Sequence, residues 1–259
     1  MWDRRPQSPS TLPVQSTFEI NKHNLREASG FLRFLRYFIK DIYSIGSIAN
    51  DSIAASKMLQ MKIAKDAGFS VADTCFSNRK QDIIAFASRY EYITLKSIES
   101  DSIWNEADDL EYVFYAQKVA SDTLADVPEE AFSQTVSFVQ NYVEKAYELR
   151  VTVVEDKIFA CKIDSQILDE DKGKIDWRQG YDFGLKHETY QLPQEIGDKC
   201  ILFLKKMGLN FGCFDFIYTP NGEYVFLECN PNGQWLWIEQ ETGLEISNAI
   251  ANALIRKNR

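Results

Sequence analysis

The segment that decides the fold reads Phe211-Gly-Cys-Phe-Asp-Phe-Ile-Tyr-Thr-Pro-Asn-Gly-Glu-Tyr-Val-Phe-Leu-Glu-Cys-Asn-Pro-Asn232. Aromatic and β-branched residues fill both halves, and Asn221-Gly222 lies between them, a pattern typical of a β-hairpin. Side chains alternate along a strand, so the register depends on the length of the connection. If the connection holds an even number of residues, one face of the hairpin carries Phe214, Phe216 and Tyr218 from the first strand. These side chains then lie opposite Val225, Leu227 and Cys229 from the second strand.

In that even register the opposite face of the hairpin carries Asp215, Glu228 and Asn230. A three-residue loop, which Pro220 at the second position of a turn favours, would set Asp215 against Leu227 instead. Two facing carboxylates repel each other, yet two carboxylates and an amide oxygen are the hard ligands that Mg²⁺ or Mn²⁺ accepts. A solvated polar face is the alternative. We adopt the even register and predict a metal site, because the amide continues the same face and a Pro-Asn-Gly loop follows it directly.

Composition narrows the class of protein. A chain of 259 residues forms one large domain or two small ones. Its net charge of −9 argues against a nucleic-acid partner or a membrane surface, which call for a basic balance. Neither a secretory signal nor an apolar run of membrane-spanning length occurs in the sequence, which favours a cytoplasmic protein.

The cysteines and histidines argue against disulfide-bonded proteins, zinc proteins and enzymes that use a Ser-His or Cys-His pair. The five cysteines are widely spaced and form no CxxC motif, so we expect reduced core residues and neither disulfides nor a zinc site. His23 and His187 are the only histidines, which argues against catalysis by a Ser-His or Cys-His pair. His187 lies in a polar stretch and is expected at the surface.

The patterns predict an α+β chain of mainly antiparallel strands with helices on one side. Residues 1–18 are Pro-rich and should be extended or irregular, and residues 166–191 are polar and aperiodic, which predicts a mobile loop. A capping box is expected at Thr242 and Glu245, before a final helix. Helices are predicted over 21–41, 51–68, 79–89 and 193–208, and strands over 74–77, 92–96, 111–120, 135–142, 148–154 and 157–165.

Three side chains outside the hairpin are candidates for chemistry. Lys96 ends a strand and suits a phosphate as a point charge, although snorkelling to solvent explains it equally well. Glu148 begins another strand and suits a ribose hydroxyl or a surface ion pair. Arg178, in Asp-Trp-Arg, suits a phosphate or an acyl phosphate. The chain has no Walker lysine motif and no G-x-G-x-x-G, which excludes the P-loop and Rossmann readings.

Taken in order, several motifs resemble the ATP-grasp ligase superfamily over nearly the whole chain. They are Lys57 opening a helix that ends in Ala-Gly-Phe-Ser, Lys96, Phe138-Val-Gln-Asn-Tyr-Val, Glu148-Leu-Arg-Val-Thr-Val, Ile163-Asp-Ser-Gln, Asp176-Trp-Arg, Phe211-Gly-Cys-Phe-Asp and Glu228-Cys-Asn-Pro-Asn-Gly-Gln-Trp. Within that superfamily, the last segment together with Ile-Asp-Ser-Gln and Asp-Trp-Arg is similar to the peptide maturases of microviridin-type ribosomal peptides, the graspetides.

The resemblance implies a role for each matching residue. It implies that Lys57 and Lys96 bind the nucleotide phosphates, that Gln140, Asn141, Tyr142 and Val143 form the adenine hinge, that Glu148 binds the ribose, and that Asp215, Glu228 and Asn230 hold Mg²⁺, with Mn²⁺ as an alternative. Arg178 would contact the phosphate or acyl phosphate, and with Lys96 it forms the catalytic pair. Asn141 stands where such hinges usually carry an acidic residue, so we expect weakened adenine binding.

The resemblance also implies an architecture: an ATP-grasp fold of two α+β subdomains clasping ATP, a small one over 51–145 and a large, metal-binding one over 146–259. Residues 1–50 would be a linker and N-terminal helix, because family members resemble Trp2-Asp-Arg-Arg-Pro6 only after an α/β segment that is missing here.

The implied function is ATP-dependent cross-linking of side chains in a ribosomal precursor peptide, leader plus core, through an acyl phosphate. The resemblance is also compatible with a homodimer. One alternative is a ligase that adds an amino acid to a protein or metabolite. Another is a weakly active protein that binds a leader peptide.

Overall fold

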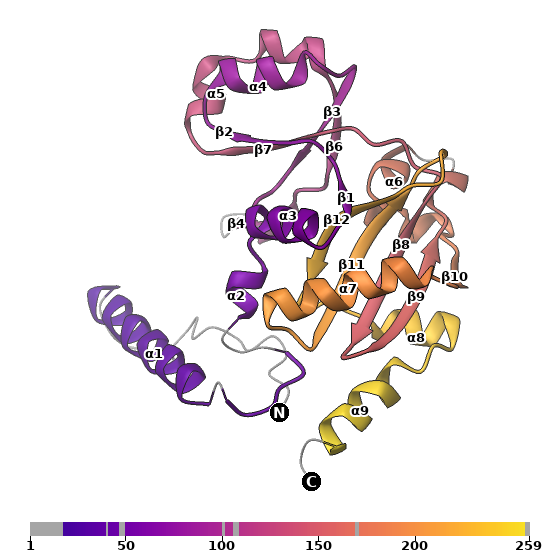
Figure 1. Cartoon of the computed structure of the whole chain (residues 1–259). Coiled ribbons are helices and arrows are strands. Elements are labelled where there is room, and N and C mark those ends of the chain that lie inside the picture. Colours follow the sequence, from indigo (N-terminus) through magenta and orange to yellow (C-terminus); the bar gives the residue numbers. More distant parts are fainter. Residues whose placement is uncertain are drawn as a thin grey trace.

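The computed structural model describes residues 18–39, 41–46, 50–99, 102–105, 109–168 and 171–256. Residues 1–17, where an extended segment was predicted, lie outside this range. Two sheets with their helices form two units, the smaller one at the top of Figure 1. No helix in the described part of the chain is both long and apolar enough to cross a membrane.

The larger sheet, among the described residues, has six strands in the order β1-β12-β11-β8-β9-β10. They are β1 (Ser70–Val71), β8 (Tyr147–Val154), β9 (Lys157–Ile163), β10 (His187–Tyr190), β11 (Phe211–Tyr218) and β12 (Tyr224–Asn230). Only β1 and β12 run parallel among these neighbours, and the others are antiparallel. The predicted α+β class with mostly antiparallel sheets is confirmed.

The β11–β12 hairpin uses both registers that the sequence allowed. At its far end Asp215 pairs with Glu228, as the even register predicts. A β-bulge follows, so that Phe216 pairs with Phe226 and Leu227 is the extra residue. The predicted pairing of Leu227 with the apolar row is therefore wrong, and Leu227 lines a cavity on the polar side. The bulge lets a five-residue connection coexist with the facing carboxylates.

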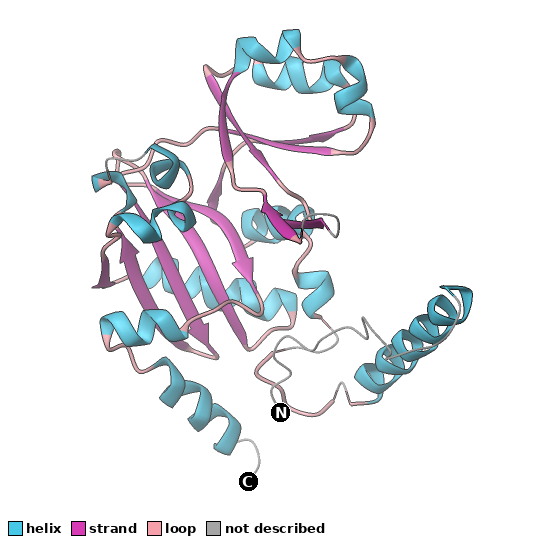
Figure 2. Cartoon of the chain, turned by 180° about the vertical axis from the view of Figure 1, so that it is seen from behind, coloured by secondary structure: helices cyan, strands magenta, loops and turns pink. Residues whose placement is uncertain are grey.

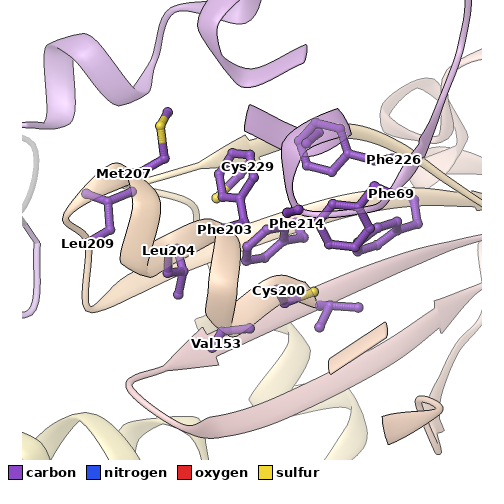
Figure 3. Close-up of a cluster of buried hydrophobic side chains, with 14 of the residues drawn as sticks. Phe69, Val153, Cys200, Phe203, Leu204, Met207, Leu209, Phe214, Phe226 and Cys229 are labelled. Carbon is purple, nitrogen blue, oxygen red and sulfur yellow. The ribbon is translucent and has the colours of Figure 1, made fainter. Parts of the chain in front are cut away.

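One face of this sheet packs against α7 (Gln194–Met207), whose Pro193 start and Gly208 end were predicted and are confirmed. The core there is rich in phenylalanine, with Phe203 of α7 in contact with Phe214 and Phe226 at ring-centroid distances of 5.4 Å (Figure 3). Each of these rings is fully buried and contributes about 2 kcal/mol of apolar transfer free energy. This core holds the hairpin rigid from behind.

The opposite face packs against α8 (Leu236–Thr242) and α9 (Ile246–Arg256), and Figure 2 views the sheet from that side. The prediction of helices on one side only is therefore wrong, because Val154, Cys161 and Ile163 present a second apolar surface. The predicted capping box does not form either. Glu239 of α8 accepts the Ser247 backbone N–H at 2.7 Å and its hydroxyl at 2.5 Å, so a neighbouring helix caps α9.

The smaller unit is a four-stranded sheet in the order β2-β7-β3-β6, covered by two helices. Its elements are β2 (Thr74–Ser77), α4 (Lys80–Ala87), β3 (Tyr92–Lys96), β6 (Gln117–Ala120), η1 (Ser121–Asp126), α5 (Glu129–Ser133) and β7 (Ser137–Asn141). The strand predicted over 111–120 is two strands. Its first half, β5 (Leu110–Val113), pairs with β4 (Ser102–Asn105) as a separate hairpin, and the chain turns away before β6.

In the described part of the chain, the helices before the sheets are α1 (Phe18–Phe38), α2 (Asp51–Ala54) and α3 (Lys57–Asp66). The helix predicted over 51–68 is thus broken before Lys57. Met61 of α3 and Phe69 after it belong to the core of the six-stranded sheet. The predicted subdomain boundary at residues 145 and 146 stays a prediction, and α3 packs with the large sheet although it precedes the small one in sequence.

The segment 166–191 is structured where the structure describes it. It forms η2 (Ser165–Ile167), α6 (Asp171–Ile175), η3 (Trp177–Phe183) and β10, so the predicted aperiodic loop is wrong. The prediction that His187, in β10, lies at the surface is also wrong. The His187 side chain is 2% exposed, bonds Glu241 through Nδ1 and packs edge-on against Trp237, because α8 covers β10.

All five cysteines are free. Four of them are buried and Cys75 is half-buried.

Candidate active site

One cavity of about 900 Å³ lies between the two sheets, and every site residue proposed from the sequence lines it. These residues are Lys57, Lys96, Gln140, Asn141, Tyr142, Val143, Glu148, Arg178, Asp215, Glu228 and Asn230. They come from α3, from β3 and β7 of the small sheet, from β8, β11 and β12 of the large sheet, and from η3. Residues that lie up to 173 positions apart, as Lys57 and Asn230 do, thus share one site.

The two facing carboxylates each have a cation. Arg150 of β8 lies opposite Asp215 on β11 and donates to Asp215 Oδ2 at 2.6 Å. Lys57, at the start of α3, donates to Glu228. Although burial favours the neutral acid, Lys57, with Lys96 and Arg150, lowers the pKa of Glu228 to about 2. Burial raises the pKa of Asp215, and the nearby Glu228 adds to this effect.

The carboxylates and the amide fit a divalent metal. Asp215 Oδ1 is buried and has no hydrogen-bond partner among the described residues, so this oxygen is available as a ligand. Asn230 lies two residues beyond Glu228 and so on the same face of β12. In the described part of the chain no three His, Cys, Asp or Glu side chains form a metal cluster.

Lys96, at the end of β3, faces the cavity and does not snorkel to solvent. Burial lowers its pKa to about 8, and the cations Lys57 and Lys145 act in the same direction, against an opposing effect of Glu228. The ammonium of Lys96 faces the cavity as a point charge that suits an anion such as a phosphate.

Glu148, on β8, belongs to a buried cluster and not to a surface ion pair. It accepts hydrogen bonds from Lys145 and Ser165. The side chains of Glu148 and Lys145 are 4% and 5% exposed. Burial raises the pKa of Glu148, and its two donors offset part of this effect. A carboxylate held in this way keeps a fixed orientation towards the cavity.

The strand β7 ends at the hinge segment. Gln140 is buried and donates to Thr74 Oγ1 at 3.0 Å. Asn141, the departure from the family pattern, accepts the Asp73 backbone N–H at 2.7 Å with its side-chain oxygen. Its side chain therefore holds the neighbouring loop, while Asn141, Tyr142 and Val143 line the cavity.

The segment Asp176-Trp177-Arg178 lines the cavity, and we call it the arm. Asp176 is 7% exposed and accepts from Arg178 at 2.8 Å and from the Ala116 backbone N–H at 3.1 Å. Burial opposes ionisation of Asp176, yet the bonds from Arg178 lower its pKa below the ordinary value. Trp177 stacks at a tilt against Trp237 of α8, with ring centroids 5.5 Å apart.

Sequence reasoning missed several residues of this site, namely Lys145, Arg150, Ser165 and Asp176. Strand alternation was a usable signal for one of them, because Arg150 shares a face with Glu148 two positions earlier. The others are placed by tertiary contacts, which no local pattern records.

The comparisons with known proteins agree with this geometry. Residues 54–254 match the family described as the RimK-like ATP-grasp domain. No curated protein sequence matches the chain. The crystal structure of macrocyclase MdnC from Microcystis aeruginosa MRC, bound with precursor peptide MdnA, superposes with a TM-score of 0.81 at 27% identity, over 98% of this chain and 77% of that one.

Two further structures extend the comparison. The RiPP-associated ATP-grasp ligase of Chryseobacterium gregarium, in complex with ADP and a leader and core peptide, gives a TM-score of 0.84 at 27% identity, over 99% of this chain and 76% of that one. The ATP-grasp ligase PsnB, complexed with minimal precursor, Mg and ADP, gives 0.74 at 21% identity, over 95% and 72%, a likeness of fold alone. The chain belongs to the RimK-like ATP-grasp family and is an ATP-dependent ligase of that fold.

Proposed function

We propose that the protein cross-links side chains of a ribosomally made precursor peptide, joining a carboxyl group to an amine or a hydroxyl of the same peptide. The observation that carries the proposal is the likeness, over 98–99% of this chain, to two ligases whose structures hold a precursor or a leader and core peptide. A single cavity lined by all the residues expected to bind nucleotide and metal supports it further.

In the proposed complex the nucleotide spans the two sheets. The hinge residues 140–143 face the adenine, and Glu148, held by Lys145 and Ser165, faces the ribose. Lys57 and Lys96 neutralise the phosphates from the two sides of the cavity. Binding would draw Lys57 from Glu228 towards the nucleotide and release that carboxylate.

Asp215, Glu228 and Asn230 would hold Mg²⁺, or Mn²⁺ in its place. The ion supplies positive charge at the oxygens of the transferring phosphoryl group. Arg150 would stay on Asp215 Oδ2, where it orients the carboxylate and favours its ionised form, and Oδ1 would be left to act as a metal ligand.

The proposed chemistry has two steps. A peptide carboxylate takes the γ-phosphoryl group of ATP, giving an acyl phosphate and ADP. A peptide amine or hydroxyl then attacks the acyl carbon and phosphate leaves, so that the peptide loses one water. Phosphoryl transfer needs positioning and charge neutralisation more than covalent help, and Lys96 and Arg178 supply cations for both steps. The scarcity of histidine fits this requirement.

Intact-mass analysis tests the proposal. Purified protein, ATP and Mg²⁺ are incubated with candidate precursor peptides encoded beside the gene, and the peptide is expected to lose one water per cross-link. D215N serves as the inactive control. A mass gain equal to an amino-acid residue would replace the proposal with amino-acid addition. An unchanged peptide that nevertheless binds tightly would favour a leader-binding protein.

A further inference from the structure

The last turn of α6 is held from outside the helix at two carbonyl groups. The Lys174 carbonyl accepts from Gln166 Nε2 at 3.0 Å, and the Ile175 carbonyl accepts from Lys145 Nζ at 2.8 Å. Carbonyls in the last turn of a helix lack partners within the helix, so these side chains satisfy them. The arm begins at the next residue, Asp176. The two side chains thus fix the point from which the arm leaves the helix.

The arm is attached again on the other side of the cavity. Asp176 accepts the Ala116 backbone N–H at 3.1 Å, and the Arg178 guanidinium lies over the Tyr115 ring at 5.4 Å. Tyr115 and Ala116 precede β6 of the small sheet, whereas α6 follows β9 of the large one. Asp176, which accepts from Arg178, is thus attached both to the end of α6 and to the segment before β6, and both attachments determine where Arg178 lies at the cavity.

Lys145 connects the arm to the nucleotide end of the site. It follows the hinge segment 140–143 by two residues and bonds both Glu148 and the Ile175 carbonyl. Burying an ion pair costs about as much desolvation free energy as its attraction returns, and an apolar pair packs equally well. Packing therefore does not explain why Lys145 and Glu148 are charged. Their charges are explained if they fix the orientation of three groups, namely Lys145, Glu148 and the Ile175 carbonyl.

Gln166 completes the connection, because the same Nε2 atom also donates to Ser165 Oγ at 2.9 Å. Ser165 in turn bonds Glu148. The arm and the carboxylate proposed to bind ribose thus share two chains of hydrogen bonds, one through Lys145 and one through Gln166 and Ser165.

We propose that Lys145 and Gln166 are positioning residues of the ligation: by holding the carbonyls of Lys174 and Ile175, they set the place of Arg178 at the cavity. The proposal rests on the proposed function, which gives Arg178 its role at the transferred phosphoryl group. Lys145 and Gln166 act through Arg178.

A double-mutant cycle tests this action through Arg178. Q166L is expected to lower the kcat of peptide cross-linking about tenfold and to change the KM for ATP less than about twofold, because the ligand groups stay while the arm shifts. In an R178M background Q166L should have little further effect, less than about twofold. K172M, an exposed lysine on the same helix, is the matched control and should behave as wild type. Additive losses of kcat would overturn the proposal.

Hydrogen–deuterium exchange gives a readout that needs no peptide. In Q166L and in K145M the amides of residues 174–178 should exchange about tenfold faster than in wild type, while those of α7 keep their protection. Exchange at 174–178 that is unchanged in both variants would overturn the proposal, and so would a loss of protection that extends to α7. If wild-type protein cross-links no peptide, the proposed function fails, and exchange still decides whether these side chains hold the arm.

Discussion

Lys57 and Arg150 each hold one of the two carboxylates that face each other across the β11–β12 ladder. Like charges at paired ladder positions destabilise a sheet, and these cations offset that repulsion. The arrangement keeps Glu228 ionised at neutral pH, since its pKa is lowered to about 2. The charges that a metal and a nucleotide require are therefore in place before either binds.

Asp215→Asn should abolish Mg²⁺-dependent ATP turnover, by about a hundredfold or more, because a charged ligand of the proposed metal is lost. Repulsion between the carboxylates alone would predict a higher melting temperature for this variant. The structure reverses that expectation: Arg150, with a side chain 9% exposed, would keep a charge without its counterion. Removing one partner of such a pair costs about 3 kcal/mol, so the melting temperature should fall.

E223Q, which neutralises an exposed carboxylate in the turn of the same hairpin, is the control and should leave turnover and melting temperature unchanged. E228Q should lose turnover like D215N. Full ATPase activity in both D215N and E228Q would refute the metal assignment.

Nucleotide affinity should fall as the pH rises through about 8, the value to which burial lowers the pKa of Lys96. Below that pH the ammonium is charged and binds phosphate. Above it the folded apo protein loses the proton before the unfolded chain does, so the Lys96 contribution to folding stability rises while its contribution to binding falls. Calorimetric titration with ADP between pH 7 and about 9 checks this. K96R should remove the decline, and a decline of equal size in K96R would assign it to another group.

At the scale of elements, a β-bulge and the loop after β12 determine where the residues of the site lie. The bulge at Leu227 changes the hairpin register between the turn and the carboxylates. The loop after β12 returns to β11 so closely that a Cβ on Gly233 would lie 2.4 Å from Cys213 Cβ and 2.9 Å from an Arg150 guanidinium nitrogen. This loop also gives Arg150 a second acceptor, the Gln234 carbonyl at 3.3 Å.

Gly233→Ala should therefore damage both stability and activity. The added methyl group has to displace Arg150 or the β11 backbone, and overpacking of this kind costs about 1–3 kcal/mol. Denaturant unfolding and ATP turnover measure the two effects. G30A, in α1 with nothing within 4 Å of the added Cβ, is the control and should be neutral or slightly stabilising. Wild-type turnover and stability in G233A would contradict the close approach.

Glu239 should contribute more to α9 than Glu245, the residue that the sequence pattern indicated. E239A removes two bonds to Ser247 and should cost about 1 kcal/mol, the usual effect of losing a helix cap. E245A removes an exposed bond to Asn248 and should cost less than about 0.5 kcal/mol. Midpoints of urea unfolding compare the two variants. The reverse order of stabilities would show that the capping box operates after all.

Local patterns predicted the elements that local interactions determine. The helix of α7 has its proline at the start and its glycine at the end, and the predicted strand over 148–154 differs from β8 by one residue. The failures have tertiary causes: α6 and η3 are short turns that carry little periodicity, and the break between β5 and β6 depends on a separate hairpin. The sequence did not predict the bulge, because the bulge combines two hairpin registers that were treated as alternatives.

At the scale of the whole molecule, one cavity joins residues of both sheets. Alternation could place Asp215 with Glu228, but no periodicity relates either of them to Lys96, which belongs to the other sheet. Only the resemblance to the ATP-grasp superfamily placed Lys96 in the same site as Asp215 and Glu228. The arm then joins the sheets across the cavity through the bond between Asp176 and Ala116, a contact that neither local pattern nor resemblance indicated.

The central claim, that a peptide carboxylate is phosphorylated before it is joined, has a direct test. A substrate peptide whose carboxyl groups carry ¹⁸O is incubated with the protein, ATP and Mg²⁺, and the released phosphate is analysed by mass spectrometry. Attack on an acyl phosphate expels the former carboxylate oxygen with the phosphorus, so each cross-link should yield ADP and one phosphate carrying a single ¹⁸O atom. Unlabelled phosphate, or AMP with pyrophosphate, would contradict the account.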